Sequence, residues 1–584
     1  MKLTGLLLPP VLLSQLCSAV PTAQSEPCDD ADGNKRGAVA SESKECSEVG
    51  AQILKQGGNA ADSMASAEPA CGGGDAEADC RCRSPRCCVW GGIGGGGFML
   101  VRSKNGSYAF IDFRETAPAA AFQDMYNNNT DASLYGGLAS GVPGELRGLQ
   151  HLHENYGKLP WKDVVLPSVK IARDGFVVGK DLVEYMDSAV ASAKDVVGNF
   201  LVDDPNWAID FAPNGTRLGL GDMITRKRYA ATLETIAEHG PDAFYSGPIA
   251  QTWINHTRAT GGNMTLEDLK NYTVAIRKPA SIAYRDFNIH SCSAPSSGTI
   301  AMSIMKIIEG YSSIGWASAV NESTHIFNEA LRFGYGQRAN LGDPLFVEGL
   351  DQYQEEILSE AVVSEVQAKI SPLQTFNTSY YDPSGLESLE TPGTAAVTTA
   401  DADGLAIALT STINLLFGSK VLIPETGIIA NNEMNDFSVP GQSNAFGFIA
   451  SPANYVAPGK RPLSSITPTI VEHSNGTLYF VTAAAGGSRI LTATVQNLWN
   501  VLDKNATSAE SLAAPRLHDQ LVPNQVSFEY AYDNQTVAYL ASLGSNVTWV
   551  APGGSSAQCL RRLSDGTFEA AGEPRQFDSG GVVV

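Results

Sequence analysis

The spacing of hydrophobic residues predicts a strand followed by a helix near the start of the chain. Residues 37–59 open with a short β-prone run, and Val49, Ile53 and Leu54 then recur on one face of a helix. Gly57-Gly58 follows and ends the helical period. A strand that leads directly into a helix is typical of a mixed α and β fold.

Further along, the pattern separates a helix-rich region from a strand-rich one. Residues 98–102 and 108–113 predict a hairpin, because Asn105-Gly106 between them is a strong turn signal. Residues 141–375 contain amphipathic stretches separated by polar loops, which favours helices. Four β-prone runs follow (AAVTTA, LAIALTST, TPTIVEH and TLYFVTAAA), and a helix returns in ILTATVQNLWNVLD. This order indicates sheets with helices packed outside them.

The stretch TPGTAAVTTADADGLAIALTSTIN predicts a hairpin with a threonine near each end. Asp401-Ala402-Asp403-Gly404 is a turn sequence between two β-prone segments. With the turn centred on Asp403, Thr394 and Thr412 lie opposite each other, because each is nine residues from the centre. Opposed residues on one face of an antiparallel pair lie within side-chain reach. Threonines favour strands in any case, so the register alone identifies no catalytic group.

The charge balance excludes some classes of partner. The chain has 584 residues, a net charge of −22 and a pI near 4.8, whereas nucleic acids and anionic membranes select basic surfaces. Hydrophobic residues make up 43% of the chain, which is enough for a large core. The charge therefore argues against a nucleic acid or an anionic membrane surface as the main partner.

The start of the chain has the pattern of a secretory signal peptide over residues 1–19. Lys2 supplies the positive end, Leu6 to Leu16 the apolar stretch, and Cys17-Ser18-Ala19 the small-residue cleavage site. An uncleaved membrane anchor and a vacuolar destination are the alternatives to secretion. Twelve Asn-x-Ser/Thr glycosylation acceptors also favour export. They are Asn105, Asn128, Asn214, Asn255, Asn263, Asn271, Asn321, Asn377, Asn475, Asn505, Asn534 and Asn546.

Nine short motifs occur in the order found in γ-glutamyltranspeptidases. They are GGNA, GIGGGGFML, FRETAP, GVPGELRG, GTAA, TSTIN, NNEMNDF, PGKRPLSSITPTIV and AAAGGSR. The chain resembles this family from about residue 37 to residue 581. The resemblance implies an N-terminal-nucleophile αββα sandwich, in which helices cover both outer faces of two stacked sheets. It also implies self-cleavage between Gly393 and Thr394, giving a heterodimer of residues 20–393 and 394–584.

The resemblance implies a threonine nucleophile that cleaves glutathione and related γ-glutamyl amides without a cofactor. Cleavage before Thr394 frees an α-amine whose reference pKa of about 7.7–8.0 suits a general base. Attack by the hydroxyl forms an acyl-enzyme, which water hydrolyses or an amino acid or dipeptide amine accepts. Thr412 matches the residue that orients the nucleophile. Gly486 and Gly487 match the donors that stabilise the oxyanion.

The γ-glutamyl group carries an α-carboxylate and an α-ammonium, and the resemblance assigns residues to each. Arg114 matches the carboxylate clamp, since a guanidinium can grip a carboxylate through two hydrogen bonds. Ser464 and Ser465 match hydroxyl groups that bind the same carboxylate. The groups that match the ammonium site are Asn414, Glu433 and Asp436.

Two features depart from the family pattern. Ala396 stands where the family usually has histidine, two residues after the nucleophile. Residues 61–90 replace an alanine-rich buried helix with a segment that has five cysteines, three consecutive glycines and no helical or strand period. A gene-model fault, such as a translated intron or a local frame error, and a lineage-specific loop are both open as explanations.

Other hypotheses remain beside the active enzyme. One is a secreted, catalytically impaired family member that acts only by binding, and another is an acylase with a different acyl group. Gly92-x-Gly94-x-x-Gly97 fits a dinucleotide fingerprint, but a cysteine-rich stretch precedes it instead of a strand. The cluster Cys80, Cys82, Cys87 and Cys88 has poor spacing for a metal, so no metal site is expected.

Overall fold

The computed structural model describes residues 36–70, 92–386, 394–441 and 449–584. The expected signal peptide, Gly393 and the crowded cysteines therefore lie outside the described residues. Among the described cysteines, Cys292 and Cys559 are buried free thiols, and Cys46 is also buried. In these ranges no helix is long and apolar enough to cross a membrane.

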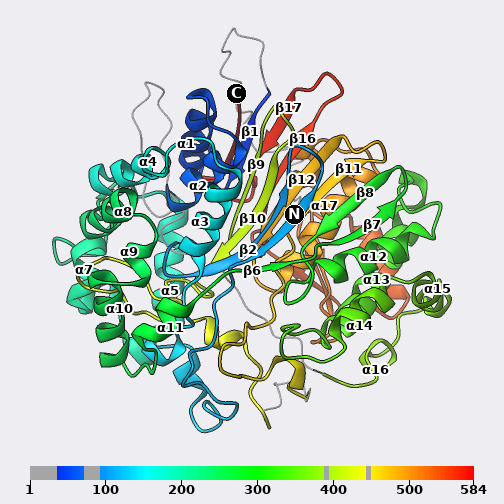
Figure 1. Cartoon of the computed structure of the whole chain (residues 1–584). Coiled ribbons are helices and arrows are strands. Elements are labelled where there is room, and N and C mark those ends of the chain that lie inside the picture. The colour runs from blue at the N-terminus through cyan, green and yellow to red at the C-terminus, as the bar shows by residue number, and fades with distance from the viewer. Residues whose placement is uncertain (1–35, 71–91, 387–393, 442–448) are drawn as a thin grey trace, which may run out of the picture. The chain divides into compact units, whose positions relative to one another are not determined.

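Two stacked β-sheets form the centre of the fold (Figure 1). The first has the strand order β18-β1-β9-β10-β2-β3-β6 and the second has the order β17-β16-β12-β11-β8-β7. The bounds of the first are β18 Gly580–Val583, β1 Ala38–Ser41, β9 Ala395–Ala400, β10 Ala406–Thr412, β2 Gly96–Arg102, β3 Tyr108–Asp112 and β6 Ala275–Arg277. Those of the second are β17 Phe568–Ala571, β16 Ser556–Arg562, β12 Leu478–Ala485, β11 Thr469–His473, β8 Phe287–Ser291 and β7 Ala280–Tyr284.

Helices cover the outer faces of both sheets, with smaller sheets at the edges. The helices are α1 Lys44–Lys55, α2 Ala60–Ala70, α3 Glu145–Tyr156, α4 Trp161–Asp174, α5 Lys180–Val197, α6 Phe200–Asp203, α7 Pro205–Phe211, α8 Lys227–His239, α9 Asp242–Tyr245, α10 Pro248–Ala259, α11 Leu266–Asn271, α12 Gly298–Glu309, α13 Val320–Arg338, α14 Leu350–Ile357, α15 Glu360–Lys369, α16 Thr378–Tyr381, α17 Arg489–Leu502, α18 Ser508–Ala513 and α19 Asn534–Ser542. The small sheets pair β4 Phe176–Val177 with β5 Met223–Ile224, and join β13 Leu517–His518, β14 Val526–Glu529 and β15 Val547–Val550.

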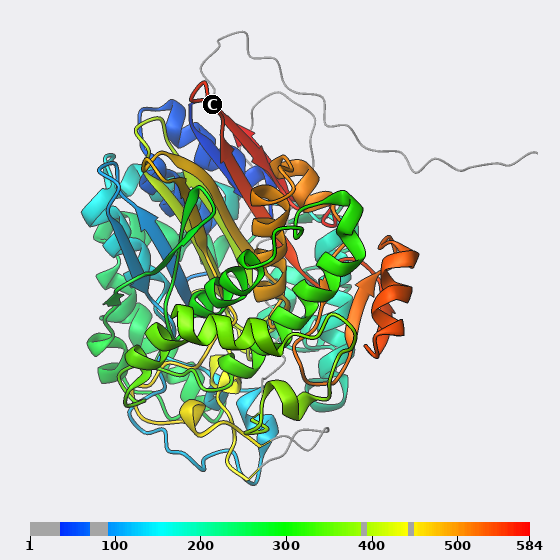
Figure 2. The same cartoon turned by 90° about the vertical axis from the view of Figure 1, so that its right-hand side faces the viewer.

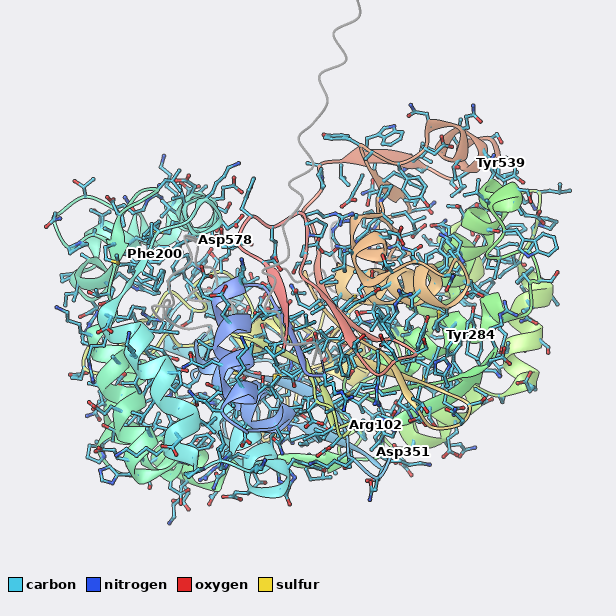
Figure 3. All side chains as sticks on the ribbon, turned by 90° about the horizontal axis from the view of Figure 1, so that it is seen from above. Arg102, Phe200, Tyr284, Asp351, Tyr539 and Asp578 are labelled. Carbon is cyan, nitrogen blue, oxygen red and sulfur yellow. The ribbon has the colours of Figure 1, made fainter. Side chains whose placement is uncertain are left out.

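Alternation along the strands explains the layers. In β2, Phe98 and Leu100 belong to the core cluster that includes the second sheet, whereas Met99 and Val101 pack with α1, α2 and α3. Figure 2 looks onto the side covered by α12 to α16. Figure 3 shows the strands from above between two bodies of helices, with Phe200 on one side and Tyr284 and Tyr539 on the other. The predicted αββα architecture is confirmed.

One local prediction was confirmed in part and another was wrong. Residues 141–375 are helix-rich as expected, with α3 to α15, but this region also contains the short strands β4 to β8. The segment expected to be irregular from residue 61 begins instead with α2, whose residues 61–68 are buried. Asn59 starts this helix, because its side chain accepts the N–H groups of Ala61 and Asp62 while its own N–H donates to the Asp62 carboxylate.

Helix α2 nevertheless contains buried polar atoms that no residue in the described ranges satisfies. These are Ser63 Oγ, Ser66 Oγ and Glu68 Oε2. Burial raises the pKa of Glu68 to about 7, because the charged form loses its hydration. Three orphaned groups on one helix mean that its sequence suits a buried position poorly. Residues 71–90, the rest of the anomalous segment, lie outside the described residues.

Candidate active site

Thr394 lies at the start of the β9–β10 hairpin. The ladder pairs Ala396 with Thr410 and Ala395 with Ser411, so the same register extended by one residue places Thr394 opposite Thr412. Asp401 shapes the turn by accepting the backbone N–H groups of Asp403 and Leu405. The predicted register is thereby confirmed.

The Thr394 hydroxyl contacts the turn that follows β12. The Gly486 N–H donates to Thr394 Oγ1 at 3.0 Å, and the Thr394 residue is 5% exposed. Gly486 and Gly487 both have positive φ, +123° and +59°, which glycine adopts readily. We call this pair the glycine turn. It places a backbone donor beside a hydroxyl, as a nucleophile and an oxyanion donor must be placed to act on one carbonyl.

Thr412 and Asn414 lie where β10 ends. Thr412 Oγ1 accepts the Asn414 N–H at 2.7 Å, and Asn414 Nδ2 donates to the Asn432 carbonyl oxygen at 2.9 Å. Asn414 has φ +70°, a left-handed conformation that asparagine tolerates better than most residues. A Cβ on Gly95 would lie 2.0 Å from the Thr412 carbonyl oxygen. This close approach gives the glycine-rich stretch before β2 a structural purpose without a nucleotide.

Arg114, Glu433 and Asp436 form a buried ionic cluster, which we call the Arg114 cluster. Arg114 Nη1 lies 2.6 Å from Glu433 Oε1, and Arg114 Nη2 donates to Asp436 Oδ2. The side chains are 1%, 1% and 7% exposed, respectively. The cation and the acidic residues that the sequence assigns to opposite ends of a substrate therefore contact each other in this structure.

The Arg114 cluster keeps unused hydrogen-bonding capacity. Within the described residues, Arg114 Nε, Asp436 Oδ1 and Ser465 Oγ are buried without a hydrogen-bond partner. Buried groups without a partner are rare in proteins, so these three are candidates for contacts with a polar substrate. Burial raises the pKa of Glu433 well above its usual range and that of the adjacent Glu115 to about 8.

A polar bridge through Asn454 links the backbone of Asp436 to the segment that contains Ser464 and Ser465. Asn454 Nδ2 donates to the Asp436 carbonyl oxygen at 2.7 Å, and its Oδ1 accepts the Leu463 N–H at 2.9 Å. Ser464 Oγ accepts the Ile466 N–H at 3.2 Å, so its hydroxyl hydrogen is not used in that contact. Both serines are buried, being 6% and 4% exposed. The structure thus draws together most of the predicted site from separate parts of the chain.

Several supporting residues were missed at the level of sequence. Asn431 binds the carbonyl oxygens of Gly94 and Gly141 and accepts the Glu433 N–H, so it joins the glycine-rich stretch to the Arg114 cluster. The Tyr335 hydroxyl donates to the Ser488 carbonyl oxygen at 2.5 Å, directly after the glycine turn. The adjacent asparagines in NNEMNDF were a possible signal for the role of Asn431. Nothing near Tyr335 in the sequence indicates that its hydroxyl supports the glycine turn.

Ala396, the departure next to the nucleophile, leaves the surrounding strand intact. It is 0% exposed and belongs to the core cluster that includes both sheets. A methyl group fits such an apolar position without an unsatisfied polar atom. The described residues contain no group of three or more His, Cys, Asp or Glu side chains placed to hold a metal ion.

Comparisons with known proteins identify the family of the chain. The family model described as Gamma-glutamyltranspeptidase matches residues 46–583. The glutathione hydrolase proenzyme of Arthroderma benhamiae is 53% identical over 583 residues, covering 98% of this chain and 97% of that protein. The glutathione hydrolase of Aspergillus flavus is 48% identical over 549 residues, covering 94% and 89%, respectively. The cephalosporin acylase of Bacillus halodurans shares the fold at 24% identity, with a TM-score of 0.80 over 94% of this chain and 95% of that one. This chain therefore belongs to the γ-glutamyltranspeptidase family.

Proposed function

We propose that Thr394 is the nucleophile of a γ-glutamyl hydrolase and transferase that acts on glutathione and related γ-glutamyl amides. The observation that carries this proposal is the 3.0 Å hydrogen bond between the Gly486 N–H and Thr394 Oγ1, in a chain that is 53% identical to a glutathione hydrolase proenzyme. It places the proposed nucleophile beside an oxyanion donor.

Maturation uses the same hydroxyl. Thr394 Oγ attacks the Gly393 carbonyl carbon, the Oγ–C bond forms, the peptide C–N bond breaks, and the hydroxyl proton passes to the departing nitrogen. Water then hydrolyses the ester and leaves residues 394–584 with a free α-amine. That amine takes the hydroxyl proton in later turnovers, when the γ-carbonyl of the substrate is attacked. The two fragments remain together because the first sheet contains strands from both.

The Arg114 cluster explains selectivity for a γ-glutamyl head group. When a zwitterionic head group binds, its carboxylate takes the place of Glu433 and Asp436 beside Arg114. Its ammonium group then takes the place of Arg114 beside these two acids. The exchange leaves the net charge of the buried site unchanged, which keeps the desolvation cost low. An acyl group without an amino-acid head leaves these charges without substrate partners. The residues therefore favour γ-glutamyl substrates over a different acylase specificity.

The proposed activity has a direct test in anilide substrates. We expect the processed protein to release aniline from γ-glutamyl anilide, and to release it faster when a dipeptide acceptor is added. Glutaryl anilide has the same acyl chain without the ammonium group, so kcat/KM falls by about 10²-fold or more. Equal turnover of the two anilides would contradict the head-group assignment, and no turnover by the processed protein would refute the activity.

Replacement of Gly486 by alanine tests the glycine turn. The new Cβ would lie 2.7 Å from the Gly554 carbonyl oxygen and 2.8 Å from Ser555 Cα, in a backbone conformation that L residues rarely adopt. Displacement of the Gly486 N–H lowers kcat by about 10²-fold or more, with a smaller change in KM. Gly219→Ala, where no heavy atom lies closer than 3.8 Å to the new Cβ, is the control. Wild-type kcat in Gly486→Ala would exclude this donor.

We also propose that the protein is exported and glycosylated. Ten of the twelve acceptor asparagines are exposed, and the other two, Asn263 and Asn321, are half-buried. Sugar attachment needs access from solvent, so these positions are compatible with modification. Treatment of the secreted protein with an N-glycosidase should lower its apparent mass. Retention of the protein inside the cell without sugars would contradict this proposal.

A further inference from the structure

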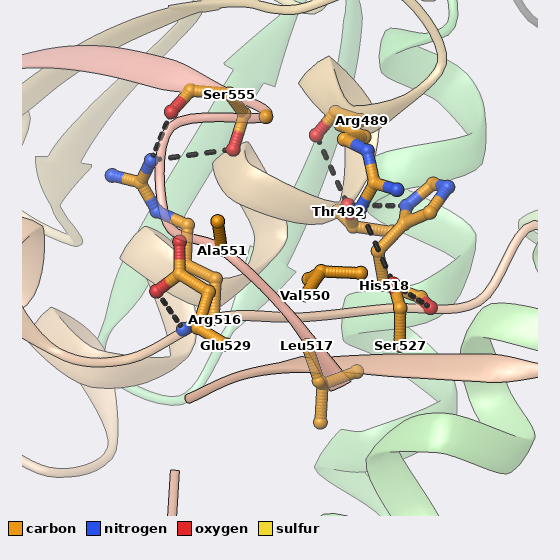
Figure 4. Close-up of a pocket in the computed structure, with 11 residues that line it drawn as sticks. Arg489, Thr492, Arg516, Leu517, His518, Ser527, Glu529, Val550, Ala551 and Ser555 are labelled. Carbon is orange, nitrogen blue, oxygen red and sulfur yellow. Dashed lines mark hydrogen bonds between the residues drawn. The ribbon is translucent and has the colours of Figure 1, made fainter. Parts of the chain in front are cut away.

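A cavity of about 110 Å³ lies behind the glycine turn (Figure 4). Its walls come from the start of α17, from β13, β14 and β15, and from the loop before β16. Gly554 and Ser555 in that loop are the residues against which Gly486 packs. The rim is open to solvent, because Ala551 to Gly554 are exposed. The cavity is therefore accessible, and one of its walls is the support of the glycine turn.

Among the charged residues that line the cavity and the residues paired with them, there is one more arginine than there are glutamates. Arg516 Nη2 pairs with Glu573 at 2.7 Å, and Arg575 pairs with both Glu573 and Glu529 at 2.9 and 2.6 Å. Arg489 Nη1 donates to Ser527 Oγ at 3.2 Å, and Arg489 has no ion pair within the described ranges. Three guanidinium groups thus face two carboxylates. The uncompensated charge is that of Arg489, which is half-buried in the cavity wall.

The side chains of Thr492, His518 and Ser527, which also line the cavity, carry no charge that could offset or increase that of Arg489. His518 Nε2 lies 2.9 Å from Gln520 Oε1 and His518 Nδ1 lies 2.9 Å from Thr492 Oγ1, whose hydroxyl also contacts the Arg489 carbonyl oxygen at 3.0 Å. Burial, together with the charge of Arg489, lowers the pKa of His518 to about 3, so the ring is neutral at physiological pH. The Ser527 hydroxyl donates to the His518 carbonyl oxygen. Figure 4 shows Arg489, Thr492 and His518 together on one side of the cavity.

We infer that this cavity binds a small oxyanion, a carboxylate or phosphate group, held by the guanidinium of Arg489. A guanidinium has five donors in a planar fork that matches carboxylate and phosphate oxygens, and within the described residues the fork of Arg489 makes one hydrogen bond, to Ser527. The volume holds several waters or one small anion, and it is too small for a nucleotide or a whole glutathione molecule. The site is separate from the Arg114 cluster and does not depend on the proposed activity.

Calorimetric titration of the purified, processed protein with sodium phosphate and with sodium acetate tests this site. Sodium chloride at the same ionic strength supplies the baseline. We expect saturable binding to the wild type and binding about tenfold weaker or less to Arg489→Gln, which loses the charge-assisted hydrogen bonds. Binding of phosphate alone, or of acetate alone, identifies the preferred oxyanion and supports the site. The absence of saturable binding for both anions, or equal binding by Arg489→Gln, overturns it.

Two further variants keep the test decisive. Arg258→Gln removes an exposed arginine on α10 and should bind the anion as the wild type does. Ala551→Phe places a ring at the exposed rim of the cavity and should weaken binding without touching Arg489. If Arg489→Gln fails to fold, the second variant carries the test, and unchanged binding in Ala551→Phe excludes the cavity as the binding place.

Discussion

Replacement of Thr394 by alanine removes self-cleavage and γ-glutamyl hydrolysis together. The variant lacks the hydroxyl that attacks both the Gly393 carbonyl carbon and the substrate, so no other group in the described site can replace it at the same place. We expect kcat to fall by about 10⁴-fold or more, and the chain to remain a single polypeptide on a denaturing gel. The anilide assay and the gel measure the two effects on one preparation.

Thr394→Ser is the matched control for this result. Serine keeps a hydroxyl and, after cleavage, an α-amine, so the variant should still cleave itself and retain part of the activity. Thr394→Ala should also keep the wild-type thermal midpoint within a few degrees, since only a small polar group is lost. An unprocessed Thr394→Ala protein with wild-type activity would refute the nucleophile assignment.

Replacement of Arg114 by glutamine has the second largest expected effect. It removes the proposed carboxylate clamp and leaves Glu433 and Asp436, which pair with Arg114, without their cation. Truncating one partner of a buried charge pair costs about 2–5 kcal/mol, so kcat/KM for γ-glutamyl anilide should fall by about 10³-fold. Steady-state kinetics at several substrate concentrations measure the loss.

Two variants distinguish the loss of substrate binding by Arg114 from a loss of activity that replacement of any arginine would cause. Arg114→Lys keeps the charge but loses the planar fork, so its kcat/KM should lie between those of the wild type and Arg114→Gln. Arg217→Gln removes an arginine that pairs with the exposed Asp187 and should leave kcat/KM unchanged. If Arg114→Gln matches wild-type kcat/KM while being fully processed, Arg114 does not bind the substrate.

The hairpin shows what local sequence can predict. The turn around Asp403 fixes the pairing of β9 with β10, because an antiparallel register follows from the position of its turn. The same reasoning found β2 and β3 around Gly106. It missed β6, β7 and β8 because their short, partly polar runs do not stand out among helices. The polar residues of α2 gave no helical pattern in the sequence, so this helix was not predicted. Burial and the Asn59 cap stabilise it in the structure.

The candidate site needed more than local pattern. Arg114, Glu433 and Ser465 lie far apart in the sequence, and no periodicity links them; only the resemblance to a family placed them in one site. Their mutual contact was not predicted, since the sequence assigned the cation and the acids to opposite ends of a substrate. That contact follows from electrostatics, because charges buried away from water are stabilised by the nearest opposite charge.

The N-terminal sequence of the smaller fragment of the purified protein tests the central claim most directly. The account predicts two bands on a denaturing gel, the smaller holding about one third of the residues, and Thr394 as the first residue of that fragment. A protein that stays uncut while it hydrolyses γ-glutamyl anilide, or a fragment that begins at another residue, would contradict it.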